Sequence, residues 1–293
     1  MARRHELTDD QWHVIEPLLP VPGSRGRPRV DDRRVINGML FKARTGIAWR
    51  DLPERHGPWK TVHNRFWRWS HNGTLTTLAA GVRVIAEAID ELDREVSVDS
   101  SIVRAHQHAA GARTRARPTR GAVGTHVGHI EPADHAIGHS RGGPTTKIHL
   151  ACDGHGRPLS IVLTGGNVND CTMFEQVMAG IRFGRPGPGR PGTRPSRVIA
   201  DKGYSTRTIR AHLRRRRIPT TIPERRDQQA NRRRRGHAGG RPPVFEHTAY
   251  RRRNVVERCF NRLKQFRAIA TRYDKTALSY RGMLGLATLT LWL

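Results

Sequence analysis

The stretch YRRRNVVERCFNRLK, residues 250–264, repeats apolar residues at helical spacing and predicts one continuous helix. At about 100° per residue, its residues Tyr250, Arg253, Glu257 and Lys264 fall within about 60° of one another and form a polar stripe. The apolar residues of the neighbouring sector are Val255, Val256, Cys259, Phe260, Leu263 and Phe266. The helix can therefore pack on a core while it presents a carboxylate flanked by cations. Taken alone, the stripe is typical of a solvent-exposed helix face with an i,i+4 ion pair between Arg253 and Glu257.

The composition of the chain indicates a polyanionic partner. Its 293 residues, 36% of them hydrophobic, are enough for a sizeable core. The 53 Lys and Arg residues outnumber the 25 Asp and Glu residues and give a net charge of +28. Such a chain repels itself unless a polyanion is present, so nucleic acid is the expected partner, rather than a small molecule or a membrane.

The cysteines and the N-terminus predict a location in a reducing compartment. The three cysteines contain no C-x-x-C pair, so they form neither a disulfide framework nor a zinc ligand set. The N-terminal residues lack the apolar run of a signal peptide, and no apolar stretch approaches the roughly 18 residues that would span a bilayer. We therefore expect a cytoplasmic protein.

Residues 1–78 are predicted to form an all-helical domain. Thr8 can cap a first helix, and Asp31 or Asp32 can cap a second. Several prolines and glycines separate these helices from each other and from a third, which follows a Gly-Pro turn. Three short helices with a basic last helix resemble a helix-turn-helix module.

The third helix is the candidate for reading DNA. Its exposed, DNA-facing residues are expected to be Asn64, Arg65 and Arg68, while Trp67 and Trp69 are expected to lie at least partly in the core. A small helical domain whose tryptophans are simply core residues is the alternative.

The loop before the second helix contains a basic segment with a central proline. Proline makes the backbone around Arg27 and Arg29 extended. This segment fits a DNA minor groove and fits a plain linker equally well.

Residues 79–293 order as strands and helices typical of a mixed α/β domain. Asp99 lies near the centre of a predicted strand at 95–104, where an aspartate costs stability unless a cation or a donor satisfies it. Asp201 follows a short apolar strand at 197–200. The remaining predictions are a hairpin of strands at 145–151 and 158–164, a capped helix after 167–170, a second capped helix after 205–206, a strand at 218–222, a basic loop at 228–243 and a last core helix at the C-terminus.

Residues 107–140 are predicted to form a long loop or a disordered insertion. The stretch is rich in Gly, Arg, His, Thr and Pro and shows no periodicity. Its histidines lack cysteine partners and helical i,i+4 spacing, so a structural metal site is not expected there.

Three acidic residues, Asp99, Asp201 and Glu257, lie in sequence surroundings where a solvent-exposed charge that only aids solubility is not expected. If they converge, they form a hard-oxygen site that suits Mg²⁺ or Mn²⁺. Two such ions would activate an attacking oxygen and stabilise the leaving one in an in-line phosphodiester displacement. No protein nucleophile is then needed.

Over nearly its whole length the chain resembles the DDE-class insertion-sequence transposases of the group related to insertion sequence five. The motifs that carry the resemblance are VDSSIVRAH at 98–106, SRGGPTTKIHL at 140–150, DKGY at 201–204 and the spacing Tyr250-x2-Arg253-x3-Glu257-x6-Lys264. The last is the most specific, because four residue types match at fixed spacings. The stretch at 46–69 resembles the helical DNA-binding domain of the same proteins. The 107–140 stretch is longer than expected for the group.

The resemblance implies a retroviral-integrase-like, RNase H-like catalytic domain in which Asp99, Asp201 and Glu257 are catalytic and bind two Mg²⁺ or Mn²⁺ ions. It implies a bacterial, nucleoid-associated enzyme that cleaves double-stranded DNA at the terminal inverted repeats of its element. The enzyme would then transfer the 3′-OH ends to target DNA, acting as a homo-oligomer when DNA is bound. The residues expected to hold DNA near the carboxylates are Tyr250, Arg253, Lys264 and Lys202.

Two alternatives remain from the sequence. A repressor derived from an inactive transposase would bind the terminal repeats without cleaving them. A metal-dependent nuclease of the same fold would cleave DNA without strand transfer.

Overall fold

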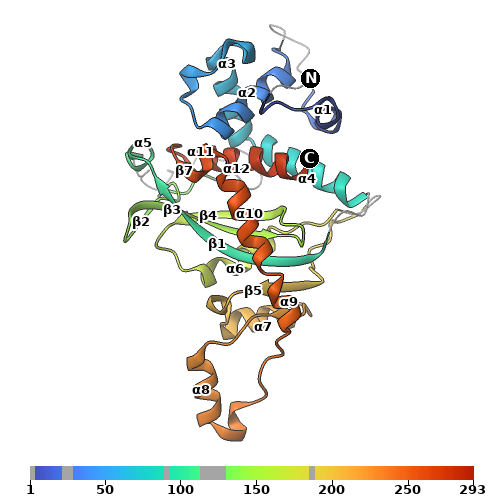
Figure 1. Ribbon diagram of the computed structural model, residues 1–293, viewed down its shortest axis with the longest axis vertical. Helices are drawn as coiled ribbons and strands as arrows, with labels where there is room; N and C mark the ends of the chain where they lie inside the picture. The colour runs from blue at the N-terminus through green and yellow to red at the C-terminus, as the bar shows by residue number, and fades with distance from the viewer. Residues whose placement is uncertain (1–3, 22–28, 89–92, 113–129, 185–188) are drawn as a thin grey trace, which may run out of the picture.

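The computed structural model describes residues 4–21, 29–88, 93–112, 130–184 and 189–293. Figure 1 shows the N-terminal helices at one end of the long axis, a sheet in the middle and helix α8 at the other end. The α-helices are α1 (Asp9–Ile15), α2 (Asp32–Thr45), α3 (Trp59–His71), α4 (Thr74–Ala88), α5 (Gln107–Ala110), α6 (Asp170–Ala179), α7 (Arg207–Arg215), α8 (Arg226–Arg234), α9 (His247–Arg251), α10 (Asn254–Lys264), α11 (Arg267–Ala270) and α12 (Ala277–Trp292). The 3₁₀ turns are η1 (Glu16–Leu18), η2 (Trp49–Asp51), η3 (Glu54–His56), η4 (Lys202–Tyr204) and η5 (Gly236–Gly239).

One mixed sheet organises the second part of the chain. Its strands are β1 (Glu95–Ala105), β2 (Gly138–Ser140), β3 (Gly143–Cys152), β4 (Pro158–Gly165), β5 (Arg197–Ala200), β6 (Thr220–Thr221) and β7 (Thr271–Arg272). Strand β1 is antiparallel to β3 and parallel to β5, which is parallel to β6, and β4 is antiparallel to β3. The resulting order β4-β3-β1-β5-β6 is that of the RNase H-like fold, so the predicted fold class is confirmed.

Two strands pair with the same edge of β1 and leave a gap between them. β5 pairs with the stretch from Glu95 to Val98, and β7 pairs with Arg104 and Ala105. Between them, β1 has no strand partner on that edge among the described residues. Asp99 lies at the start of this gap, directly after the last residue that pairs with β5.

Helices cover both faces of the sheet. Cross-strand pairs share a face, so Asp99 points to the same side as its partner Leu150, and Ser100 points to the opposite side with His149. Helix α10 packs on β1 and β3 on the first side, and α6 packs on β3 and β4 from the other (Figure 1). The two faces are thus distinct, and Asp99 belongs to the α10 face.

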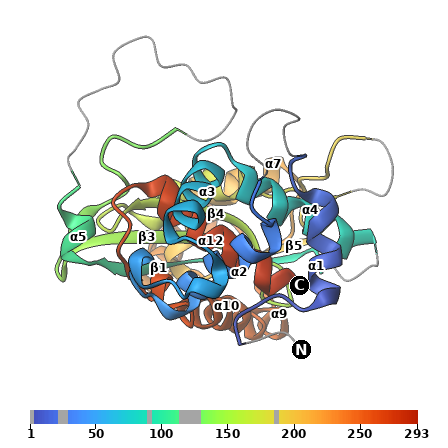
Figure 2. The same cartoon turned by 90° about the horizontal axis from the view of Figure 1, so that it is seen from above.

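The apolar C-terminal helix α12 joins the two parts of the molecule. It packs on α2, α3 and α4 and also on β4, as the view from above shows (Figure 2). Most of its side chains are buried in a core that continues from the N-terminal helices to the sheet. The C-terminal run is therefore a core helix, as predicted, and the expected domain boundary at residues 78 and 79 falls inside α4.

The predicted helix caps form as expected. Thr8 and Gln11 make a capping box at the start of α1, and Asp31 accepts backbone hydrogen bonds at the start of α2. Gly46 ends α2 in the left-handed conformation, with a φ of 72°, which favours glycine. Thr206 caps α7 in the same manner as Thr8.

The prediction of one helix over 250–264 was wrong, because the chain breaks between α9 and α10. Arg252 donates two hydrogen bonds of 2.7 Å to Glu95, and Arg253 donates one of 2.8 Å to Asp99. Both side chains at the break are thus bound to residues of β1, and the break aims them at that strand.

The prediction of a basic loop over 228–243 was also wrong, since α8 and η5 form there. Gln228 accepts from the backbone N–H of Arg225 and also bonds Ser205, so it fixes the start of α8 to the neighbouring chain. Arginine and glutamine favour helices, but α8 buries no side chain. Its sequence therefore lacks the regular spacing of apolar residues that predicts a helix.

Two smaller expectations need correction. Within 107–140, α5 and β2 are regular elements, while the central part of the stretch, 113–129, lies outside the described residues. The strand predicted at 218–222 is reduced to Thr220–Thr221.

Candidate functional site

Asp99 stands half-buried on β1 beside the gap in the edge pairing. Its Oδ1 accepts from the backbone N–H of Ser100 at 2.8 Å, and its Oδ2 accepts from the Arg253 guanidinium at 2.8 Å. Burial raises the pKa of the Asp99 carboxyl, and the Asp201 carboxylate raises it further, while the Ser100 and Arg253 donors oppose the rise. The net direction is upward, because the effect of burial outweighs that of the two donors.

Asp201 stands where β5 ends. The register pairs Val98 with Ala200, so Asp201 follows the last paired residue of β5 as Asp99 follows that of β1. Because the two strands are parallel, the two aspartates lie at the same level of the sheet. Asp201 caps η4 and accepts from the backbone N–H of Gly203 at 2.9 Å.

Glu257 lies one turn after Arg253 on α10 and is exposed. Its Oε1 accepts from Nη2 of Arg253, whose Nη1 donates to Asp99, so one guanidinium bridges two of the three acidic residues. Burial disfavours the charge of Arg253, but the Asp99 and Glu257 carboxylates outweigh this and raise its pKa. Arg253 is therefore a permanent cation between the two carboxylates.

The other residues predicted to hold DNA near the carboxylates have mixed settings. Lys264 donates to Ser101 Oγ at 2.6 Å, one residue pair further along β1. Tyr250 is half-buried, and its ring centroid lies 5.1 Å from that of Phe245. Lys202 is exposed next to Asp201. These contacts leave the proposed DNA-binding roles untested.

On helix α3 the structure separates the three predicted DNA-facing residues. Asn64 and Arg68 are exposed, as expected. The expectation that Arg65 is exposed was wrong, since it is 8% exposed, pairs with Asp32 and lies 5.5 Å from the centroid of a tryptophan ring. Its partner lies 33 residues earlier in the chain, where sequence spacing gives no signal.

The two tryptophans of α3 also differ. Trp69 is in the core, at 3% exposure, whereas Trp67 is 51% exposed and stacks on His71 at a centroid distance of 4.2 Å. The expectation that Trp67 is at least partly core was wrong. The exposed face of α3 thus contains an aromatic ring as well as Asn64 and Arg68.

The basic loop segment is only partly described. Arg27 lies outside the described residues. Arg29 is half-buried, forms an ion pair of 2.8 Å with Asp32 and donates to the Pro20 carbonyl at 2.9 Å. Its side chain is therefore tied to the helical domain.

A half-buried ion pair between β3 and α6 was missed by the sequence reasoning. Lys147 on β3 pairs with Asp170 at the start of α6 over 2.9 Å. Burial raises the pKa of the Tyr204 phenol, and the negative charges of Asp99, Asp170 and Asp201 add to this rise. The available signal was a lysine in the middle of an apolar strand.

The carboxylates of Asp99, Asp201 and Glu257 are of the ligand type that a hard divalent cation prefers. Their side chains do not form a complete set of metal ligands in the described structure. Among the described residues, no group of three or more His, Cys, Asp or Glu side chains lies close enough to hold a metal ion. Glu257 instead turns to Arg253, which supplies the positive charge between Asp99 and Glu257. Carboxylate oxygens on neighbouring strands are the ligands that Mg²⁺ and Mn²⁺ prefer.

The strand order and the acidic residues after Val98 and Ala200 define an RNase H-like domain with a carboxylate site. Two family models match the chain: "Putative transposase of IS4/5 family" over residues 7–79 and "Transposase DDE domain" over residues 90–292. The second match covers more than half of the chain, so the chain belongs to the DDE transposase family. This confirms the resemblance to insertion-sequence transposases.

Several proteins are similar to parts of the chain, and two of the three that follow are named as putative transposases of insertion sequences. An uncharacterized protein of Sinorhizobium fredii, y4sN, is 46% identical over 110 residues, which are 36% of this chain and 82% of that protein. A putative transposase of the element IS6501 from Brucella ovis is 30% identical over 149 residues, which are 51% of this chain and 98% of that protein. A putative transposase of the element IS402 from Burkholderia cepacia is 34% identical, over 47% of this chain and 57% of that protein.

The similarity to solved structures is weak. The catalytic domain of the Mos1 mariner transposase gives a TM-score of 0.27 at 12% identity, covering 78% of this chain and 90% of that one. The fold assignment therefore rests on the strand order of the chain itself and on its family. Along the described chain, no helix combines the length and apolar character needed to cross a lipid bilayer.

Proposed function

We propose that the protein cleaves DNA at the ends of an insertion sequence and transfers the 3′-OH ends to target DNA, with Asp99, Asp201 and Glu257 as ligands of two Mg²⁺ or Mn²⁺ ions. One observation carries the proposal: Asp99 and Asp201 stand at the same level of two parallel strands, and Arg253 links Asp99 to Glu257. Bound divalent ions would polarise the scissile phosphate and lower the pKa of an attacking water.

The residues of the chain divide the remaining work. The guanidinium of Arg253 holds the carboxylates of Asp99 and Glu257 in place and offers a cation to a phosphate of the bound DNA. Lys264 has its charge half-buried against Ser101 on the same face, where it adds to the attraction for the DNA backbone. Tyr250 offers an aromatic face to a terminal nucleotide.

Double-stranded DNA is the partner in this proposal, and pairing of two ends makes a homo-oligomer the expected DNA-bound form. Residues Asn64 and Arg68 on α3 are exposed and fit contacts to base edges or phosphates. The net charge of +28 supports the attraction for DNA in general.

The test is cleavage of duplex DNA that carries the inverted repeats flanking the gene. The wild-type chain with Mg²⁺ is expected to nick this duplex at the element ends and to join them to a plasmid. Asp99→Asn, Asp201→Asn and Glu257→Gln should each abolish cleavage while DNA binding remains. Wild-type rates in any one of the three variants would refute the assignment of that residue.

The same assays separate the alternatives. Cleavage without joined products would indicate a nuclease. Specific binding to the repeats, with no metal-dependent cleavage by the wild-type chain, would indicate a repressor.

A further inference from the structure

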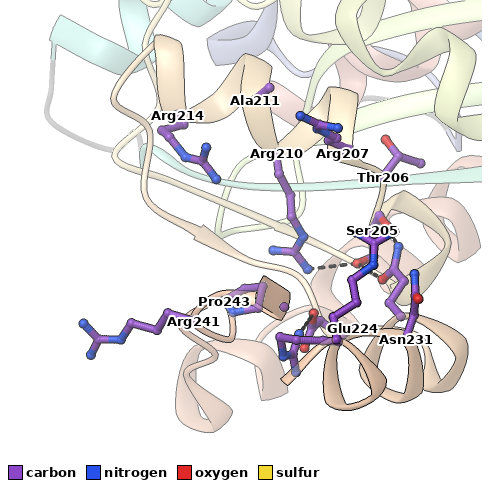
Figure 3. Close-up of a pocket in the computed structure, with 14 residues that line it drawn as sticks. Ser205, Thr206, Arg207, Arg210, Ala211, Arg214, Glu224, Asn231, Arg241 and Pro243 are labelled. Atoms are coloured by element: carbon purple, nitrogen blue, oxygen red, sulfur yellow. Dashed lines mark hydrogen bonds and ion pairs between the residues drawn. The ribbon is translucent and has the colours of Figure 1, made fainter. Parts of the chain in front are cut away.

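A basic cleft lies between α7 and α8, at the opposite end of the molecule from the N-terminal helices (Figure 1). Its volume is about 500 Å³, and Figure 3 shows arginines of α7 pointing across it toward α8. The cationic residues of its lining are Arg207, Arg210, Arg214, Arg232, Arg235 and Arg241. One acidic residue, Glu224, is part of the lining, and it pairs with Arg232.

A second hollow of about 490 Å³ continues the cleft on the side of β6. Arg210, Arg214 and Arg241 line both hollows. The two therefore form one groove that extends from between α7 and α8 toward β6, and we call it the arm groove.

Several cations of the arm groove have no partner in the protein. Within the described chain, the side chains of Arg207, Arg214, Arg235 and Arg241 have no hydrogen bond and no ion pair, and all four are exposed. Arg210 differs, since it donates to Ser205 and to the Ile222 carbonyl at 2.9 and 2.8 Å. The groove thus has a fixed guanidinium at its floor and free ones along its rim.

The chain around the arm groove is strongly basic. Residues 207–241 contain thirteen arginines against two acidic residues, a net charge of +11 in the space of 35 residues. Burial lowers the pKa of Arg210, the Glu224 carboxylate opposes this, and the nearby like charges of Arg214 and Arg232 lower it further. Such crowding of like charges costs free energy unless an external anion compensates it.

The arm groove is attached to the loop that follows Asp201. Ser205 and Thr206 form one wall of it, only a few residues after that aspartate. Ser205 Oγ donates to Gln228 of α8 at 2.8 Å. The groove thus shares a wall with the segment that follows Asp201.

We infer that the arm groove binds the phosphate backbone of DNA, as a contact surface separate from α3 and from the carboxylate site. Guanidinium groups suit phosphate oxygens by their fork of donors, and an open groove with a cationic rim fits an extended polyanion better than a single small anion. The inference rests on the proposed function only in taking DNA as the partner.

The test is the salt dependence of binding to a random-sequence duplex, which reports phosphate contacts and requires no cleavage. Each lost contact lowers the slope of log K against log salt by about 0.9, so Arg214→Gln/Arg241→Gln is expected to lower it by about two. Arg215→Gln/Arg233→Gln removes the same charge from exposed arginines outside the groove lining, and its slope is expected to stay at the wild-type value.

Further variants keep the outcome interpretable. Arg214→Lys/Arg241→Lys should restore most of the slope, because it restores the charge. Equal slopes for the two Gln double variants would overturn the inference. The inference would also be overturned if Arg214→Gln/Arg241→Gln binds the duplex as the wild type does but, unlike the control variant, no longer binds inorganic phosphate. That result would indicate a small-anion site. A failure of cleavage in the wild-type chain would refute the proposed function and leave this comparison valid.

Discussion

The carboxylate site and the arm groove use the same residue type in opposite ways. At the carboxylate site, Arg252 and Arg253 each hold a carboxylate of β1, and Arg253 also holds Glu257. In the arm groove, Arg214 and Arg241 are exposed and have no protein partner in the described structure. Arginine paired inside the protein fixes geometry, whereas unpaired arginine is available to an external polyanion.

The largest expected effect separates chemistry from binding. Asp201→Asn should lower the rate of DNA cleavage by about 1,000-fold or more, because loss of a metal ligand removes several kcal/mol of transition-state stabilisation. Its salt slope for duplex binding should match the wild type. If Asp201→Asn lowers the slope of log K against log salt as much as Arg214→Gln/Arg241→Gln does, the carboxylate site and the arm groove are not separate regions.

The second effect compares a buried arginine with an exposed one by urea unfolding. Arg272 is fully buried and donates to Thr146 Oγ1 at 2.6 Å and to the His135 carbonyl at 2.8 Å. Arg272→Met should lower the free energy of unfolding by about 3 kcal/mol, because it leaves buried acceptors without donors. Arg233→Gln on exposed α8 should change it by less than about 0.5 kcal/mol. Equal losses would contradict the distinction between paired and unpaired arginines.

The third effect concerns positioning within the carboxylate site. Arg253→Gln removes the guanidinium between Asp99 and Glu257 and should lower the cleavage rate by about 10- to 100-fold, as loss of groups that orient metal ligands does. Arg252→Gln is the matched control, because Arg252 pairs with Glu95 and not with Asp99. Similar rates in both variants would refute a special role for Arg253.

The smallest effect is a change in acid sensitivity. Burial lowers the pKa of His149 from 6.5 to about 4, with Lys147 adding to the drop against the opposing pull of Asp170. The unfolded chain therefore binds the proton first, and stability is lost as the pH falls from 6.5 toward 4, by at most about 1.4 kcal/mol per pH unit. His149→Gln should flatten this part of the unfolding curve, whereas His237→Gln, in the exposed η5, should not. An unchanged slope in His149→Gln would contradict this account.

The sequence singled out two aspartates that lie at the ends of neighbouring paired stretches in the fold, but it did not predict helix α8. Their role as metal ligands stays a prediction. Asp99 and Asp201 were recognisable because a carboxylate within or after an apolar strand is costly without a partner. Helix α8 was not, because it buries no side chain and thus lacks the apolar period that indicates a helix. Its position depends on the contact between Gln228 and Ser205, which only the folded chain brings together.

The burial of Arg65 shows a related limit. On a helical wheel, Arg65 and Arg68 look equivalent, but a carboxylate from α2 draws Arg65 inward. The pairing of Lys147 with Asp170 was equally hidden, since the two residues come from different elements. Long-range ion pairs are set by the tertiary structure, so the residues that appear exposed in a sequence pattern include some that are buried.

The most direct test of the central claim is a Mn²⁺ titration of the protein bound to a duplex with the element's terminal repeat. The wild-type complex is expected to bind Mn²⁺, and Asp99→Asn and Asp201→Asn should each weaken this binding at least about tenfold, while the Arg214→Gln/Arg241→Gln complex, at saturating DNA, binds the ion as the wild type does. Unchanged Mn²⁺ affinity in both aspartate variants would contradict the assignment of the carboxylates as the metal site.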